Sequence, residues 1–146
     1  MVPSIKVACV QLTTGPEQRQ NLAAMMLLIH EAHQKGADFI ALPEVLDIIE
    51  PRRPLIFDKA EPEDKHSILQ ALRDTAATLG RWILAGSVVV KVGPEKLANR
   101  SVLINDQGQI VARYDKIHMF DVDLPDQPVY RESAAYQPGT DAVVEI

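Results

Sequence analysis

The sequence has one cysteine, few aromatic residues and no strongly basic segment. Because Cys9 stands alone among 146 residues, no internal disulfide can form and no cysteine pair can hold zinc. The formal net charge of −5, without a basic run, argues against a nucleic-acid surface. The four histidines show no metal-ligand spacing, so the sequence predicts no metal and no cofactor.

Long apolar runs and targeting signals are also lacking. No stretch reaches the roughly 18 apolar residues that span a bilayer, and residues 1–6 lack the order of a signal peptide. We therefore expect no membrane partner and a cytoplasmic location. A composition that is 47% hydrophobic and 24% charged indicates a globular chain, and residues 1–146 suffice for a single domain.

The first part of the chain predicts a β-α-β unit. Residues 5–12 are apolar and rich in β-branched side chains, which indicates a strand buried on both faces. Residues 17–35 show helical spacing of apolar side chains before Gly36, and residues 38–42 form a second apolar strand. A strand, a helix and a strand in this order favour a parallel pair.

The remaining sequence predicts one more helix and several strands. Three prolines in residues 47–62 argue against a regular element there. A turn at Asn105-Asp106-Gln107-Gly108 favours a hairpin, since glycine supplies the positive φ that such a turn needs. The other expected elements are a helix over residues 63–79, strands over 81–92, 99–104 and 109–114, a loop over 121–139 and a strand from Asp141 to the last residue.

Two charged residues come directly after predicted strands. Glu44 ends the segment Leu42-Pro43-Glu44, and Lys116 lies in Tyr114-Asp115-Lys116-Ile117-His118. A carboxylate and an ammonium at such places suit proton transfer and anion stabilisation. No cysteine follows either of them. Cys9 lies inside the first apolar run, which predicts a buried and unreactive thiol.

The ordered motifs resemble the amino-terminal half of the nitrilase, or carbon–nitrogen hydrolase, superfamily. Residues 6–11 are similar to its first strand, residues 36–44 to its glutamate motif and residues 99–121 to its lysine motif. The resemblance covers nearly the whole chain. Segments similar to the branch that holds omega-amidases and deaminated-glutathione amidases are Asp121–Pro125, Glu132-Ser133 and Pro138-Gly139.

The resemblance implies a fold and a mechanism. The fold would be α/β, the amino-terminal half of a four-layer α-β-β-α sandwich with mixed β-sheets, truncated at the C-terminus. The activity would be hydrolysis of a small linear amide or nitrile by a cysteine thiolate, without a cofactor. By resemblance, Glu44 is the general base, Lys116 stabilises the tetrahedral intermediate, and Glu132 positions the lysine and the substrate.

The family's nucleophile would follow the strand that begins at Asp141, beyond Ile146. The chain alone is therefore expected to be inactive, and a homo-oligomer or a complementary C-terminal chain is the expected partner.

Two other interpretations stay open. A non-catalytic assembly or binding module of the same fold would pair through the strand 141–146, and an unrelated α/β protein would carry charges that mimic the motifs. Each charge also has a structural interpretation, as a surface carboxylate, an ion pair or a polar loop residue. We expect a structural role for His118, and we expect Arg52-Arg53 to lie in a solvated loop rather than to bind an anionic substrate group.

Overall fold

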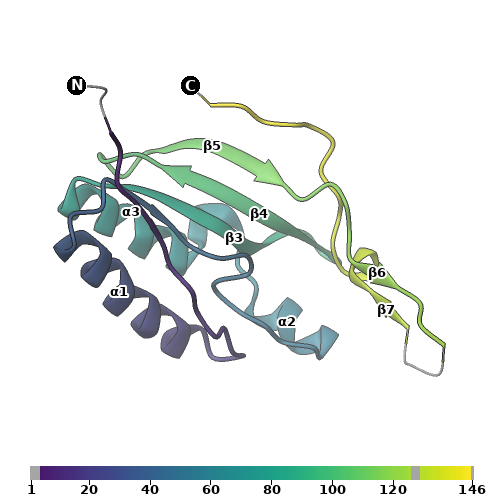
Figure 1. Ribbon diagram of the computed structural model, residues 1–146. Helices are drawn as coiled ribbons and strands as arrows, with labels where there is room; N and C mark the ends of the chain where they lie inside the picture. Colours follow the sequence, from purple (N-terminus) through teal and green to yellow (C-terminus); the bar gives the residue numbers. More distant parts are fainter. Residues whose placement is uncertain (1–3, 126–128, 146) are drawn as a thin grey trace.

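A five-stranded mixed sheet with two long helices on one face forms the centre of the molecule (Figure 1). The computed structural model describes residues 4–125 and 129–145. The strand order is β1-β2-β3-β4-β5, with β1, β2 and β3 parallel and the β3–β4 and β4–β5 pairs antiparallel. This confirms the α/β class with a mixed sheet. The elements of this body are β1 (Val7–Cys9), α1 (Gln18–Gln34), β2 (Phe39–Ala41), α2 (Arg53–Lys59), η1 (Glu63–Lys65), α3 (Ser67–Leu79), β3 (Trp82–Gly93), β4 (Lys96–Ile104) and β5 (Ile110–Asp115).

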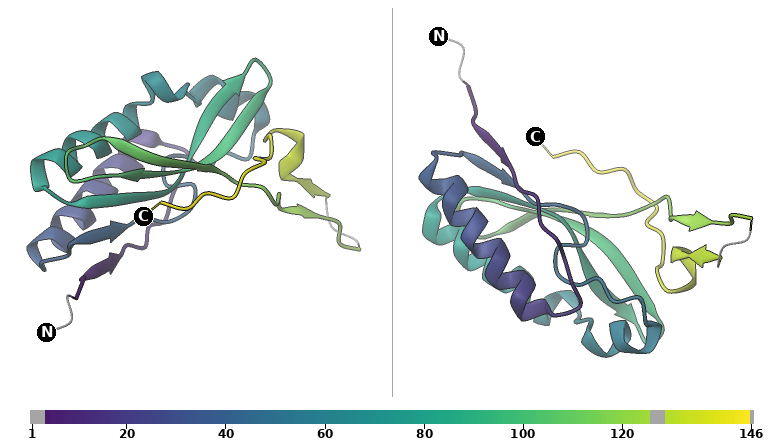
Figure 2. Two further views of the ribbon diagram at one scale, coloured as in Figure 1. Left: turned by 90° about the horizontal axis from the view of Figure 1, so that it is seen from above. Right: turned by 60° about the horizontal axis from the view of Figure 1, so that its bottom comes forward.

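Helices α1 and α3 lie side by side and bury their apolar faces against the sheet (Figures 1 and 2). Met25 of α1 and Leu72 of α3 are fully buried and belong to one cluster with Ile40 and Ile83 of the sheet. Gly80 ends α3 with φ of 60°, in the left-handed region that glycine adopts at low cost. In the part of the chain that the structure describes, no helix has the length and apolarity needed to cross a bilayer.

Strand β1 is not buried on both faces as expected. It lies at the edge of the sheet, where Ala8 packs against the core while Val7 and Cys9 are exposed. Successive side chains of a strand point to opposite faces, and α1 and α3 cover only one of them. The prediction of a buried Cys9 was therefore wrong.

The segment expected to be irregular contains helix α2. Pro54 lies in its first turn, where the missing N–H is not needed for helical hydrogen bonding. Helix α2 contributes Ile56 to a second cluster with Ile48 and Val89, on the face of β3 opposite to α3. The prolines thus mark a helix start rather than exclude a helix.

Helix α3 begins later than predicted. Residues 63–65 form the separate turn η1, and the α-helix starts at Ser67. The preceding His66 caps it, since its Nδ1 accepts a hydrogen bond of 3.4 Å from Leu69 N. An N-terminal side-chain acceptor of this kind satisfies a backbone donor that the first turn leaves free.

The carboxyl-terminal segment differs from expectation twice. A small antiparallel pair, β6 (Asp121–Val122) with β7 (Tyr130–Arg131), followed by the turn η2 (Glu132–Ala134), interrupts the predicted loop. Residues 141–145 form no strand, because their backbone has no ladder partner among the described residues, and Ile146 lies outside them. The strand edge on which the assembly interpretation depended is thus not present in residues 141–145.

Candidate active site

The three charged residues singled out in the sequence meet around one ammonium group. Lys116 Nζ lies 2.9 Å from Glu44 Oε1 and 3.1 Å from Glu132 Oε2. Glu44 follows β2, Lys116 follows β5, and Glu132 begins η2. Segments far apart in the sequence therefore deliver one cation and two carboxylates to one place, while their catalytic roles stay predictions.

The turn that carries Glu44 is held by Ser87. Ser87 Oγ accepts from Val45 N at 2.8 Å, its carbonyl accepts from Leu46 N at 2.9 Å, and its own N–H donates to Pro43 O at 3.2 Å. Val45 has φ of 49°, which is costly for a β-branched residue. Three hydrogen bonds to one residue of β3 offset this strain and fix the backbone on both sides of the glutamate.

Gly86 allows the turn to approach β3 this closely. A Cβ at residue 86 would collide with the carbonyl oxygens of Leu42 and Pro43. The pairing of β3 with β4 also shifts register between Ala85 and Val88, as at a β-bulge. A missing side chain and a local irregularity together make room for the Glu44 turn.

The backbone of Lys116 is held on both sides. Its N–H donates to Asn99 O of β4 at 2.9 Å, and its carbonyl accepts from Gly139 N at 2.9 Å. A Cβ at residue 139 would strike the backbone of Asp115. The lysine is therefore anchored before its side chain reaches the carboxylates.

Glu132 is the most buried of the three, with only 7% of its surface exposed. Its Oε2 accepts a hydrogen bond of 2.6 Å from Phe120 N, and its own N–H donates to Phe120 O at 3.3 Å. A buried carboxylate needs partners of this kind, and Lys116 supplies the opposite charge. Glu132 thus fixes the ammonium and ties η2 to the segment after Lys116.

Electrostatics keep the exposed pair ionised. The hydrogen bond from Lys116 is the largest influence and holds the pKa of Glu44 below its ordinary value. Partial burial acts to raise this pKa, and the hydrogen bond from Asn99 acts to lower it. Burial acts to lower the pKa of Lys116, but its hydrogen bonds to Glu44 and Glu132 outweigh this and raise it. Both residues therefore carry charge at neutral pH.

Sequence reasoning missed Asn99 as a site residue. This residue of β4 is 3% exposed, and its Nδ2 lies 2.8 Å from Glu44 Oε1 and 3.4 Å from Glu132 Oε1. The signal available in the sequence was an asparagine inside an apolar strand, at the start of the lysine motif. A buried amide in such a place needs polar partners, and here these are the two glutamates.

A cavity of ≈ 570 Å³ lies beside the three charges. Its wall is mostly apolar with a few charged groups, a composition usual in sites for small molecules. His118 is exposed and is not among the residues of this wall, and its structural role stays a prediction. Besides Glu44, Lys116 and Glu132, the wall consists of Val45, Ile48, Ile49, Glu50, Pro51, Arg53, Ile56, Phe120, Tyr130, Arg131, Ala134, Ala135 and Tyr136.

The two arginines considered for anion binding differ in their surroundings. Arg52 donates to both carboxylate oxygens of Glu50, at 2.7 and 2.8 Å, so its guanidinium is already occupied by a buried partner. Arg53 starts α2, stacks 5.6 Å above the ring of Phe57 and lines the cavity. Only the second arginine is thus placed to meet a bound molecule.

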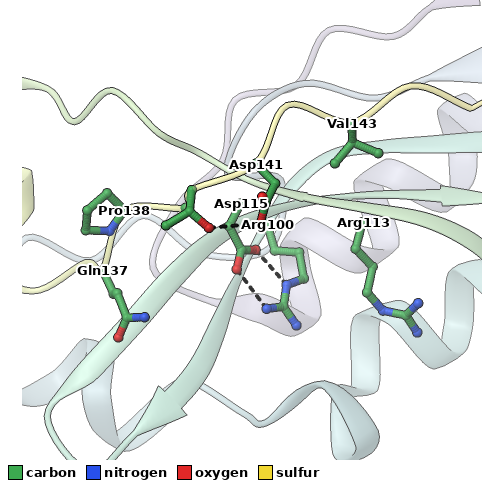
Figure 3. Close-up of a pocket in the computed structure, with 9 residues that line it drawn as sticks. Arg100, Arg113, Asp115, Gln137, Pro138, Asp141 and Val143 are labelled. Atoms are coloured by element: carbon green, nitrogen blue, oxygen red, sulfur yellow. Dashed lines mark hydrogen bonds and ion pairs between the residues drawn. The ribbon is translucent and has the colours of Figure 1, made fainter.

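A second pocket of ≈ 280 Å³ contains a charged cluster (Figure 3). Arg100 binds Asp115 through two hydrogen bonds of 2.7 and 2.8 Å and also reaches Glu63 at 2.7 Å. Arg113 binds the other oxygen of Glu63 at 2.7 Å. The guanidinium groups and carboxylates neutralise each other, which indicates a structural network rather than an anion site.

Comparison with known proteins gives consistent matches. A family described as carbon–nitrogen hydrolase matches residues 6–146. A deaminated glutathione amidase of Yersinia enterocolitica is 36% identical over 143 residues, covering 91% of this chain and 47% of the relative. An omega-amidase of Xenopus laevis is 30% identical over 138 residues, covering 92% and 48%. The chain therefore spans about half the length of the curated relatives it matches.

Solved structures share the fold. The NitFhit protein of C. elegans superposes with a TM-score of 0.83 at 24% identity, covering 94% of this chain and 34% of that one. An amidase from Nesterenkonia sp. superposes with a TM-score of 0.75 at 23% identity, covering 94% and 49%. The sheet with its helices is thus the one found in these two structures.

Proposed function

The chain belongs to the carbon–nitrogen hydrolase family, and we propose that the full-length protein hydrolyses small linear amides through a cysteine thiolate. The observation that carries the proposal is the ammonium of Lys116, held 2.9 Å from Glu44 and 3.1 Å from Glu132 beside a largely apolar cavity. The names of the curated relatives, deaminated glutathione amidase and omega-amidase, support an amide as the substrate.

In the first half of the reaction, Glu44 takes the thiol proton and the thiolate attacks the amide carbon. A carbon–sulfur bond forms, and the π electrons of the carbonyl move to its oxygen, where Lys116 stabilises the negative charge. Glu44 then gives its proton to the leaving nitrogen. The carbon–nitrogen bond breaks, ammonia departs and a thioester remains.

In the second half, Glu44 takes a proton from water, which attacks the thioester. The tetrahedral oxygen is again stabilised by Lys116, and the carbon–sulfur bond breaks as the sulfur regains its proton. Glu132 does not exchange protons in this scheme. Its buried carboxylate keeps the ammonium in place through both halves.

We propose that the nucleophile is a cysteine outside these 146 residues. Cys9 is the only cysteine of the chain, and it lines a separate hollow with Leu28 and Lys35 rather than the cavity beside Glu44. A thiol is activated by an adjacent base. None of the three charges is bonded to Cys9, and Glu31, which lines the same hollow, is paired with Lys35. The chain alone should therefore lack amidase activity.

Ammonia release tests both statements. The full-length protein and the 146-residue chain are each incubated with a linear carboxamide and, in parallel, with the corresponding nitrile. We expect release from the carboxamide by the full-length protein and none by the chain. Robust turnover by the chain would show that the nucleophile lies within it, and preference for the nitrile would change the substrate class.

We further propose that the full-length protein is a cytoplasmic homo-oligomer. Exposed apolar side chains support association, among them Ile5 and Val7 at the sheet edge and Leu27 on α1. Light scattering measures the oligomeric state, and cell fractionation measures the location. Self-association without hydrolysis of any amide or nitrile would instead favour the non-catalytic module.

A further inference from the structure

Asn99 contacts every member of the charged site. Its Nδ2 donates to Glu44 Oε1 at 2.8 Å and lies 3.4 Å from Glu132 Oε1, while its carbonyl accepts from Lys116 N at 2.9 Å. A side-chain amide carries two N–H groups, so one Nδ2 can serve both carboxylates. This residue of β4 therefore contacts all three charged residues.

The two oxygens of Glu44 have different surroundings. Oε1 accepts from both Asn99 and Lys116, at 2.8 and 2.9 Å. Within residues 4–125 and 129–145, no side chain or backbone group donates to Oε2. In this carboxylate one oxygen accepts two hydrogen bonds and the other accepts none from the described residues. Its free lone pairs therefore point in one direction.

We propose that Asn99 is a positioning residue that holds Glu44 by Oε1 and leaves Oε2 to exchange protons with the thiol, the leaving nitrogen and the water. This inference rests on the proposed amidase function. Lys116 shares Oε1 with Asn99, but an ammonium with three rotatable donors constrains the direction of a carboxylate less than a planar amide does. The Asn99 amide is buried on a central strand, so its direction is fixed by packing.

Asn99 also explains how Glu44 stays in place while half of its side chain faces solvent. The side chain of Glu44 is 59% exposed, whereas Lys116 is 26% and Glu132 is 8% exposed. An exposed ion pair is weak and mobile in water. A hydrogen bond from a buried, neutral donor adds a fixed contact that salt does not screen.

The test compares Asn99→Ala and Asn99→Asp in the full-length protein. The aspartate keeps the size and the backbone hydrogen bond to Lys116 but replaces the donor by a negative charge. The matched control is Asn105→Ala, an asparagine just beyond the end of β4 whose side chain bonds Gln109 in the hairpin turn. A carboxyl-carbon NMR titration of Glu44 gives its pKa without any turnover, and the pH profile of kcat/KM gives the kinetic consequence.

We expect the Glu44 pKa and the acid limb of kcat/KM to rise in Asn99→Ala, and to rise further in Asn99→Asp, with kcat falling about tenfold or more and KM nearly unchanged. Asn105→Ala should match the wild type. Unchanged Glu44 titration in both Asn99 variants would overturn the inference, and so would an unchanged acid limb in an active enzyme. A wild type that hydrolyses no amide refutes the proposed function instead, while the NMR titration still decides the role of Asn99.

Discussion

At the scale of single residues, the ammonium of Lys116 has three hydrogen-bond donors and two carboxylate partners. Two are directed to Glu44 and Glu132, at 2.9 and 3.1 Å. Among residues 4–125 and 129–145 no third acceptor contacts Nζ, and under the proposed function the tetrahedral oxygen would form in the cavity beside it. The lysine is thus both held in place by two carboxylates and able to serve one more negative charge.

Replacing Lys116 tests whether its ammonium stabilises the tetrahedral oxygen. In the full-length protein, Lys116→Met keeps the length of the side chain but removes the charge, and we expect kcat to fall by at least about 10²-fold, as for a lost oxyanion donor. Lys91→Met is the control, because Nζ of that lysine donates to Phe57 O and the residue does not line the cavity. Initial rates of ammonia release measure both. Retention of wild-type kcat in Lys116→Met would exclude the lysine from catalysis.

Ser87→Ala tests the turn that carries Glu44. The change leaves the N–H of Val45 without its acceptor at a partly buried position, so we expect a loss of about 1–3 kcal/mol in the free energy of unfolding. The strained φ of Val45 would relax, so kcat should fall as well. Thr78→Ala, which removes an exposed hydroxyl on α3, should change little. Urea unfolding and initial rates separate the two effects.

The sequence pattern marks Glu44 and Lys116 as candidate site residues, but it does not reveal Asn99 and Ser87, which hold them in place. Glu44 and Lys116 stand at strand ends, where the sequence pattern marks them. Asn99 and Ser87 act through contacts between strands, and these depend on the register of β3 with β4, which includes an irregularity between Ala85 and Val88. Local sequence carries little information on such a shift, because it follows from packing against the Glu44 turn.

At the scale of elements, one arginine joins three of them. Arg100 of β4 binds Asp115 at the end of β5 and Glu63 of η1, and Glu63 also binds Arg113 of β5. These groups are partly buried, with side-chain exposures of 19% for Arg100 and 22% for Glu63. The network therefore fixes the turn before α3 to the far strands of the sheet.

The network predicts a pH dependence of stability. Burial acts to raise the pKa of Glu63, but the hydrogen bonds from Arg113 and Arg100 outweigh it and lower the pKa below 4.5. A carboxyl with a lowered folded pKa stabilises above its unfolded pKa, and this stability is lost as the pH falls through the folded value. Glu63→Gln should thus flatten the fall in melting temperature below about pH 4.5.

Glu31→Gln is the matched control for that experiment. Glu31 pairs with Lys35 on α1, but the two side chains are 54% and 74% exposed, so solvent screens their interaction. Thermal unfolding followed by circular dichroism at several pH values compares the variants. Equal acid sensitivity of the wild type and Glu63→Gln would contradict the role given to the network.

Elements with strong periodicity were predicted well, and those set by tertiary partners were not. The pattern of α1 and the long run of β3 gave the correct type of element. Helix α2 was missed because proline is unfavourable inside a helix and acceptable in its first turn. Residues 141–145 have a strand-like sequence, but a strand exists only where a neighbour completes its hydrogen bonds.

At the scale of the whole molecule, the helices cover one face of the sheet and leave apolar side chains exposed elsewhere. Val7 is 50% exposed on β1, and Val144 is 82% exposed near the end of the chain. The chain spans about half the length of its curated relatives, and in the full-length protein proposed above further residues would cover this surface. This apolar surface should be more accessible in the 146-residue chain than in the full-length protein.

Binding of a hydrophobic fluorescent dye tests that difference. We expect the 146-residue chain to bind more dye per mole than the full-length protein and to scatter more light, because exposed apolar surface promotes both. Val7→Lys in the chain should reduce dye binding without affecting the core, since the side chain lies on the uncovered face of β1. Equal dye binding by the chain and the full-length protein would show that this surface is not covered.

The two backbone hydrogen bonds of Lys116 have a consequence for how such a site can diversify. Gly139 N donates to the carbonyl of Lys116, so this hydrogen bond joins the two ends of the segment between them, residues 117–138. The segment contributes Phe120, Tyr130 and Arg131 to the cavity wall. Changes in its outer part, away from Glu132, would therefore alter the cavity wall without moving the backbone of Lys116.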